Sequence, residues 1–346
     1  MMRRRVIVGV LSLLSTVVLQ GPTVSADPGS SSGSGSGCGH GLQKAADDPE
    51  TGPVCSHGAD PATDANGAEV FAADTGPAPA APCFGDGESG HRIEVIYGYP
   101  SDTPDNYAAS VPAIRSAVAF ADSYFESSDA GTAQHLRWVC DASRQVAVQK
   151  VALAPIGSDR DFTFDDMYGS VAGGPGKGKR STGFRRSDRI YVTFVDNIYG
   201  SAYSKCGEGQ RDADDSPGLN NRNNTGPAYS LIACWQGTTT LHEVGHNLGA
   251  VQNSAPHSSQ QGHCFDEFDL MCYDDDGPYF RGPDGTAGTA DDRSTQVVCV
   301  DPLRLLPYDG DRQFDCNQDD YYDPSPAAES YLATKWNVAN SNWVVK

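Results

Sequence analysis

The spacing of apolar residues changes along the chain between a period of two, typical of β-strands, and a period of three to four, typical of amphipathic helices. Ile93, Val95 and Tyr97 share one side of the first predicted strand. Ile114 and Val118 share one face of the first predicted helix. In chain order, the pattern predicts strands at 91–99, 136–140, 145–153, 189–195 and 228–235, and helices at 107–125, 164–171, 238–252 and 325–336.

Strands and helices that alternate ahead of the helix at 238–252 predict an α/β sheet domain with that helix packed against the sheet. The stretch 199–227 is rich in Gly, Asn and Asp and is expected to be a loop. Beyond Met271 regular periodicity is weak until Ser325 and Pro326, which suit the N-cap and the first position of a helix.

The first 82 residues differ in character from the rest. Residues 1–26 have the form of a secretory signal peptide: three arginines, an apolar run that is too short for a membrane span, and a Val-Ser-Ala cleavage site. Residues 27–82 are dominated by Gly, Ser, Ala, Asp and Pro and predict a low-complexity linker or a pro-segment. We expect the folded part to begin near Cys83 and to extend over residues 83–346.

The chain has ten cysteines, and in a secreted protein an even number predicts disulfide bonds. Cys38 and Cys55 are a candidate pair, although a free thiol of a pro-segment capping a metal is an alternative. The other expected pairs are Cys206–Cys234, Cys264–Cys272 and Cys299–Cys316. The net charge of -20 becomes -23 without the three signal-peptide arginines, which opposes binding to nucleic acid or to anionic membranes.

The predicted helix at 238–252 carries the chemistry. In its sequence TTTLHEVGHNLGAVQ, His242 and His246 are four residues apart, so both imidazoles project from one face of a helix and can bind one metal ion. Glu243 lies beside them, where it can act as a general base. Gly249 follows at the point where the helix has to end in a sharp turn. Downstream, Asp269-Leu270-Met271-Cys272-Tyr273 is similar to a tight turn whose methionine lies under a metal.

Together, HEVGHNLG and DLMCY make the chain resemble the metzincin clan of zinc metalloproteases, whose pattern is HExxHxxGxxH followed by a Met-turn. The resemblance covers residues 238–273. It implies an α/β (α+β) fold with a mixed, mostly parallel sheet, an active-site helix and a small, irregular C-terminal subdomain over residues 251–346. Tyr273 resembles the Met-turn tyrosine of the astacin and serralysin branches, which makes it a candidate to bind zinc or to stabilise the oxyanion.

The chain departs from the clan at the third ligand, because Gln252 stands where the third histidine is expected and an amide is a poor zinc ligand. His263 is our preferred replacement, since a Cys264–Cys272 bridge would hold it close to Met271. His257 is the second choice and Asp266 the third. A thermolysin-like arrangement with Glu267 as the ligand is a rival, but Gly249 and the Met-turn argue against it.

We therefore expect a secreted, monomeric zinc endopeptidase that acts on protein or peptide substrates, with Glu243 transferring the proton from water to the leaving amine. A catalytically silent secreted protein that binds partners through the same fold is the alternative, and Gln252 is the residue that favours it. Calcium is a further candidate ligand, because acidic residues gather at 274–277, 284–292 and 309–323.

Overall fold

The computed structural model describes residues 37–39, 41–63, 70–71, 73–128, 131–157, 162–173, 183–196, 198, 205–266, 268–298 and 313–345. The predicted signal peptide lies outside the described residues, as do Glu267 and Cys299. Everything described belongs to one unit, Ser36–Lys346. Among the described residues no helix is long and apolar enough to cross a membrane.

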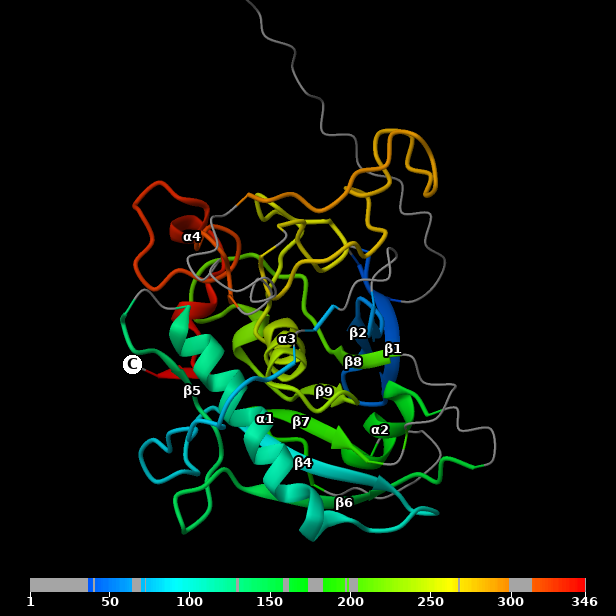
Figure 1. Cartoon of the computed structure of the whole chain (residues 1–346), viewed down its shortest axis with the longest axis vertical. Coiled ribbons are helices and arrows are strands. Elements are labelled where there is room, and N and C mark those ends of the chain that lie inside the picture. The colour runs from blue at the N-terminus through cyan, green and yellow to red at the C-terminus, as the bar shows by residue number, and fades with distance from the viewer. Residues whose placement is uncertain are drawn as a thin grey trace, which may run out of the picture. The chain divides into compact units, whose positions relative to one another are not determined.

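A six-stranded sheet runs through this unit in the order β3-β8-β9-β7-β4-β6 (Figure 1). The three pairings among β9, β7, β4 and β6 are parallel, whereas β8 pairs antiparallel with β9 and β3 pairs antiparallel with β8. The sheet is therefore mixed and mostly parallel, as expected. Its strands are β3 Asp60–Pro61, β8 Lys205–Gly209, β9 Ala228–Ile232, β7 Arg189–Val195, β4 Arg92–Pro100 and β6 Val148–Leu153.

Helices cover both faces of the sheet. Helix α1 (Tyr107–Ser127) and helix α3 (Gly237–Asn247) pack side by side on one face, and α2 (Phe164–Val171) lies on the other (Figure 1). Strand β4 serves both cores: Ile93, Val95 and Tyr97 point into the core with α1 and α3, and Ile96 points into the core with α2. This division follows directly from the alternation of side chains along a strand.

Four predicted elements match closely: β4, β7, α1 and α2. The strand predicted at 136–140 is reduced to the short β5 (His135–Leu136), which pairs with β10 (Val344–Val345). Two 3-10 turns, η1 (Arg222–Asn224) and η3 (Val338–Asn340), complete the elements.

Two expectations about regular structure are wrong. The helix predicted from Ser325 to Trp336 is only the four-residue α4 (Tyr331–Thr334). Ser325 instead donates its N–H to the Asp323 carboxylate in a local turn, a competing conformation that short polar side chains favour. The loop expected at 199–227 contains strand β8, whose sequence KCGEG lacks the apolar alternation that marks a strand.

The folded part begins well before Cys83, which corrects the expected start of the domain. Residues of the predicted linker form the hairpin of β1 (Gln43–Asp48) and β2 (Gly52–Ser56), as well as strand β3. The Cys38–Cys55 disulfide closes this hairpin, and Ala46 and Val54 pack into the core with α2. Small apolar side chains suffice here because a disulfide and the sheet edge supply the remaining constraint.

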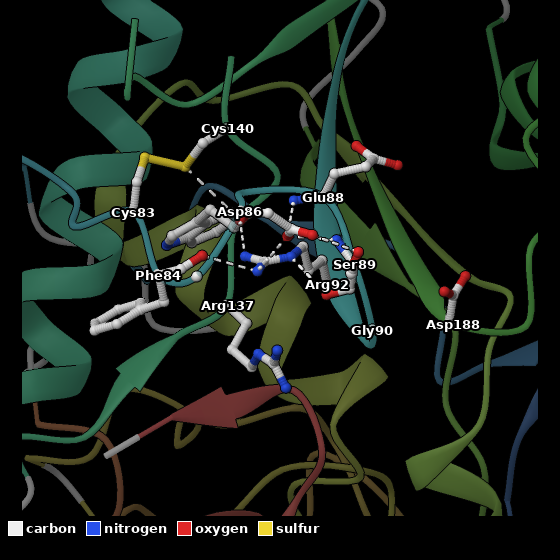
Figure 2. Close-up of polar contacts among 12 residues, drawn as sticks. Cys83, Phe84, Asp86, Glu88, Ser89, Gly90, Arg92, Arg137, Cys140 and Asp188 are labelled. Atoms are coloured by element: carbon white, nitrogen blue, oxygen red, sulfur yellow. Dashed lines mark hydrogen bonds and ion pairs between the residues drawn. A yellow bond between two sulfur atoms is a disulfide. The ribbon is translucent and has the colours of Figure 1, made fainter. Parts of the chain in front are cut away.

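The start of β4 is fixed by a buried arginine. The Arg92 side chain is 1% exposed and donates hydrogen bonds to three backbone carbonyls, those of Phe84, Ser89 and Trp138, at 2.8, 3.0 and 2.9 Å (Figure 2). The Cys83–Cys140 disulfide closes the same loop. A guanidinium group with several fixed donors is well suited to hold such a loop against the sheet.

Asp48 attaches the N-terminal hairpin to the rest of the fold. Its carboxylate accepts hydrogen bonds from the Tyr168 hydroxyl, the Arg185 guanidinium and the N–H groups of Glu50 and Thr51. Burial alone would raise the pKa of Asp48, but these hydrogen bonds lower it from 3.8 to about 2. The stabilisation is therefore complete above about pH 4 and is lost as the pH falls through about 2.

We expect Asp48→Asn to reduce the free energy of unfolding by about 2 kcal/mol at neutral pH, because the variant lacks the carboxylate. The difference between wild type and variant should shrink as the pH is lowered from about 4 to about 2. Urea unfolding of both proteins across this range measures it. A difference that is the same at both ends of the range would contradict the role assigned to the carboxylate.

Candidate metal centre

Helix α3 presents its polar residues to a closed interior. All eleven of its residues are buried, and His242, Glu243 and His246 are 0% exposed. The helix begins at Gly237, whose N–H donates to both oxygens of the Asp74 carboxylate at 3.0 Å. The negative charge of Asp74 at the N-terminus also suits the helix dipole. Three polar side chains buried in this way need partners, and the geometry shows which they have.

The two helix histidines face each other as ligands of one ion would. Their Nε2 atoms are 3.0 Å apart. His242 Nδ1 lies 2.9 Å from the Leu270 carbonyl oxygen, so this nitrogen carries the proton and Nε2 is left with a free lone pair. In a tetrahedral zinc site with Zn–N bonds of about 2.0–2.1 Å, neighbouring ligand atoms are roughly 3.3 Å apart.

His263 is the third imidazole at this point. Its ring centroid lies 5.2 Å from that of His242 and 5.1 Å from that of His246. Its Nδ1 lies 2.9 Å from Asp275 Oδ2, a carboxylate–histidine pair of the kind that orients metal ligands. The Cys264–Cys272 disulfide is present and holds the loop as expected.

The other candidates for a third ligand are engaged elsewhere. His257 Nδ1 lies 3.0 Å from Asp320 Oδ2, and this pair forms a separate group with Asp319. Gln252 donates its amide to the carbonyls of Asp212 and Gly249. Asp266, on the same loop as His263, accepts a hydrogen bond from the Val298 N–H. Asp266 belongs to none of the candidate metal-binding groups among the described residues.

The turn at 269–273 packs against α3. A Cβ atom built on Gly245 would be 2.7 Å from Met271 Sδ, so the helix and the methionine are in close contact at the residue before His246. Asp269 holds the turn, since its carboxylate accepts the N–H groups of Met271 and Cys316. Gly249 has φ +86° just after the helix, a conformation that glycine adopts at low cost.

Strand β8 crosses the other side of Glu243. A Cβ on Gly207 would lie 2.2 Å from Glu243 Oε1, and one on Gly209 would lie 2.7 Å from the Glu243 carbonyl oxygen. The Cys206–Cys234 disulfide ties the strand to the segment that leads into α3. Gly207 and Gly209 break the apolar alternation that would have identified β8 as a strand. The close approach of β8 to the helix requires glycine at both positions.

His57 and Asp60 complete the cluster. They belong to the N-terminal segment, by which we mean the described residues between 37 and 63, and the sequence analysis missed both. Asp60 Oδ2 lies 3.5 Å from His242 Nε2 and 3.6 Å from His57 Nε2, and Asp60 Oδ1 lies 3.2 Å from His263 Nε2. The available signal was a histidine and an aspartate three residues apart next to Cys55. It was lost in a stretch that composition assigns to a linker.

Tyr273 reaches the same point from the turn at 269–273. Its hydroxyl donates to Asp60 Oδ1, and its ring centroid lies 4.4 Å from that of His263. Val70 and Phe71 pack against the Tyr273 ring, and Phe71 also meets His242 edge to face. Tyr273 is therefore placed with the histidines, in contact with the group that occupies their centre.

Burial and neighbouring carboxylates set the pKa values of the imidazoles. Burial lowers the pKa of His57 and of His246 well below 6.5, which favours the neutral form that binds metals. Burial also lowers the pKa of His263, but the neighbouring carboxylates of Asp275 and Asp60 outweigh it and raise that pKa to about 9. A metal that binds His263 therefore has to displace a proton from it.

The two carboxyl groups are shifted in opposite directions. Burial, followed by the charge of Asp60, raises the pKa of Glu243 well above 4.5. Burial would also raise the pKa of Asp60, but the charges of His57 and His242 hold it well below 3.8. Two carboxyls within one site thus separate into a basic partner, Glu243, and an anionic one, Asp60.

Acidic stretches proposed for calcium are used as hydrogen-bond acceptors where they are described. Asp275 pairs with His263, and Asp292 accepts backbone N–H groups of its own loop. Asp315 accepts the N–H groups of residues 319–322, while 309–312 lie outside the described residues. Calcium binding stays a prediction. The predicted Cys299–Cys316 bridge also falls partly outside the described residues.

No family model matches the chain, and no match was found among curated proteins or solved structures. We therefore infer the function of the cluster from its geometry.

The residues fit a metal ion. His57 Nε2, His263 Nε2 and Asp60 Oδ2 are buried and make no hydrogen bond with the described residues, although they lie within 4.8 Å of one another. Asp60 is 0% exposed, and its ion-pair partners among the described residues are all histidines. Asp60 and the imidazoles around it therefore offer a set of ligands for a metal ion.

We expect His263→Ala to weaken Zn²⁺ binding by more than about 100-fold, because the loss of a ligand should exceed the 10- to 100-fold cost of losing a hydrogen bond that supports a ligand. Competition with a chromophoric chelator measures the affinity. His135→Ala is the matched control, since that histidine pairs with Asp122 and belongs to none of the described candidate metal groups. Equal affinities of the two variants would remove His263 from the site.

Proposed function

We propose that the protein is a zinc-dependent endopeptidase. The observation that carries the proposal is the convergence of His242, His246 and His263 beside the Glu243 carboxyl group. Bound to the three imidazoles, zinc would supply a Lewis acid that polarises a peptide carbonyl and makes water more acidic. Two of the three imidazoles are already oriented by second partners, Leu270 and Asp275.

Glu243 is the general base in this proposal. Its carboxyl group lies beside His242, where it can take a proton from the attacking water and return it to the leaving amine. A carboxylate oxygen of Glu243 lies within 4.8 Å of the potential ligand atoms of His242 and Asp60. Glu243 therefore reaches the centre of the cluster from its place on the helix. Tyr273 is placed to donate a hydrogen bond to the oxyanion that forms from the carbonyl.

The alternative is a catalytically silent binding protein, and Gln252 at the expected third-ligand position is the residue that favours it. The place of His263 in the cluster supports the enzyme over this alternative, because Gln252 has hydrogen-bond partners away from the histidines. The four described disulfides support an oxidising, extracellular location. We propose peptides or proteins as substrates, since the histidines and Glu243 lie beside β8, whose outer edge pairs here with the extended residues 60–61 as it could with a bound chain.

Glu243→Gln should abolish peptide hydrolysis and leave zinc bound, because the amide cannot accept the proton and no ligand is lost. Casein or a quenched peptide library measures hydrolysis, and metal analysis measures zinc. Because Asp60 lies in the centre, the assay is run in wild type and in the Asp60→Asn background. The role of Glu243 would be refuted if Glu243→Gln hydrolysed peptide as fast as the active protein that carries Glu243 in the same background.

Tyr273→Phe should lower kcat by about 100-fold with KM nearly unchanged, as removal of one oxyanion donor does in other hydrolases. Tyr279→Phe is the control, because its hydroxyl accepts a hydrogen bond from Gln296 outside the cluster. The same peptide assay in the Asp60→Asn background gives both constants. A rise in KM alone would place Tyr273 in substrate binding instead.

A further inference from the structure

We propose that the protein holds a second metal ion, a transition metal such as Zn²⁺, between His257, Asp319 and Asp320. These side chains form a group separate from the cluster around His242, and 63 positions of the sequence separate His257 from Asp320. The inference goes beyond the proposed function and does not depend on it, because a metal at this place needs no catalytic role.

The first step is the spacing of the potential ligand atoms. His257 Nδ1 lies 3.0 Å from Asp320 Oδ2 and 3.6 Å from Asp319 Oδ1. All three potential ligand atoms lie within 4.8 Å of one another. Zinc with bonds of about 2.0–2.2 Å to nitrogen and oxygen places neighbouring ligand atoms roughly 3.3 Å apart, which lies between the two measured distances. One ion can therefore contact all three side chains.

The second step is a carboxylate oxygen without a donor. Asp319 Oδ1 is buried and makes no hydrogen bond with the described residues, although the Asp319 side chain as a whole is 42% exposed. The Asp320 side chain is 1% exposed, and its Oδ1 accepts the His257 N–H at 2.8 Å, which leaves Oδ2 facing the imidazole. Two carboxylates beside one imidazole keep a net negative charge even when the imidazole is protonated. A divalent cation would balance that charge.

The third step is that both parts of the site are held in place by other contacts. The buried Asp315 carboxylate accepts the N–H groups of Asp319 and Asp320, which fixes the backbone of their loop. The His257 carbonyl accepts the Phe265 N–H at 3.0 Å, and the His257 ring meets the Phe265 ring edge to face. Ligands that are already ordered lose less entropy when they bind an ion.

The donor set indicates which class of metal fits. An imidazole nitrogen suits zinc and other transition metals, whereas calcium prefers about six to eight oxygen ligands. Here one nitrogen and two carboxylates converge, and the partial exposure of His257 and Asp319 leaves access for water to complete the coordination. Part of the acidic stretch at 309–323 would thus serve a transition metal instead of calcium.

A proton is the competing occupant of this group. The neighbouring carboxylates of Asp319 and Asp320 raise the pKa of His257 from 6.5 to about 10, so without a metal the imidazole is charged at neutral pH and forms an ion pair with Asp320. A metal that binds His257 Nδ1 has to displace that proton. The experiment therefore has to distinguish a metal site from an ion pair alone.

A metal at this place would support the loop that carries His263. Ser258 forms a β-bridge with Cys264, and Ser259 donates its N–H to the His263 carbonyl at 2.7 Å. His257 directly precedes these two serines. The second metal would therefore join the segments that pair beside His263 to the loop at 319–320.

Metal content and affinity test the site. Each full-length protein is stripped with a chelator, reloaded with Zn²⁺ and dialysed, and metal analysis gives the ratio of zinc to protein. We expect two zinc ions per chain in wild type and one in His257→Ala. Competition with a chromophoric chelator should show that His257→Ala weakens the second site by at least about 100-fold. His135→Ala is the matched control and should keep both ions.

Asp319→Asn provides a second and milder change. It keeps the size of a partly exposed side chain and weakens it as a ligand, and Asp47→Asn on the exposed side of β1 is its control. We expect Asp319→Asn to weaken the second site by at least about 10-fold and to reduce the rise in melting temperature that Zn²⁺ produces, because the lost ion no longer stabilises the folded chain. Asp47→Asn should behave as wild type.

Zinc content that is the same in wild type, His257→Ala and Asp319→Asn would overturn the second site and leave an ion pair only. Uptake of Ca²⁺ instead of Zn²⁺ at His257 would overturn the assignment to a transition metal. If His257→Ala loses zinc while His263→Ala keeps all that wild type binds, the second site stands and the zinc centre of the proposed function fails. The two failures are therefore distinguishable.

Discussion

The complete burial of His242, Glu243 and His246 is the constraint on which the rest of the structure depends. Polar side chains removed from water must find partners or bind an ion, and a helix cannot supply them from within itself. Each partner comes from a different part of the chain: Leu270 from the turn at 269–273, Asp60 from the N-terminal segment and His263 from the loop closed by the Cys264–Cys272 disulfide. The sheet and its helices serve to bring these segments to one point.

Close backbone approach makes this convergence possible. Gly245 lets Met271 pack under the helix, and Gly207 and Gly209 let strand β8 pass over Glu243. A side chain at any of these positions would push apart the surfaces that carry the ligands. The disulfides Cys206–Cys234 and Cys264–Cys272 hold the two covering segments in place. Small residues and disulfide bonds thus hold the segments of the site together, whereas large apolar residues hold the two cores together.

The N-terminal segment changes the meaning of the site. The rest of the described chain contributes three imidazoles and Glu243 beside strand β8. The N-terminal segment adds the Asp60 carboxylate and strand β3, which pairs with β8. A stretch that composition alone assigns to a linker therefore contributes His57 and Asp60 to the cluster of potential metal ligands. Its average composition does not reveal these two side chains.

The sequence by itself determined the local features. Side-chain periodicity placed β4, β7, α1 and α2, and the four-residue spacing of His242 and His246 determined a shared helical face. Only the tertiary structure decided what meets that face. His263, His57 and Asp60 lie 17 to 185 positions away from it in the sequence, and hydrophobic periodicity does not indicate contacts between residues so far apart. Strand β8 lacks the apolar alternation that would have revealed it. Local sequence sets dihedral preference and periodicity, whereas ligand sets depend on which distant loops the sheet order brings together.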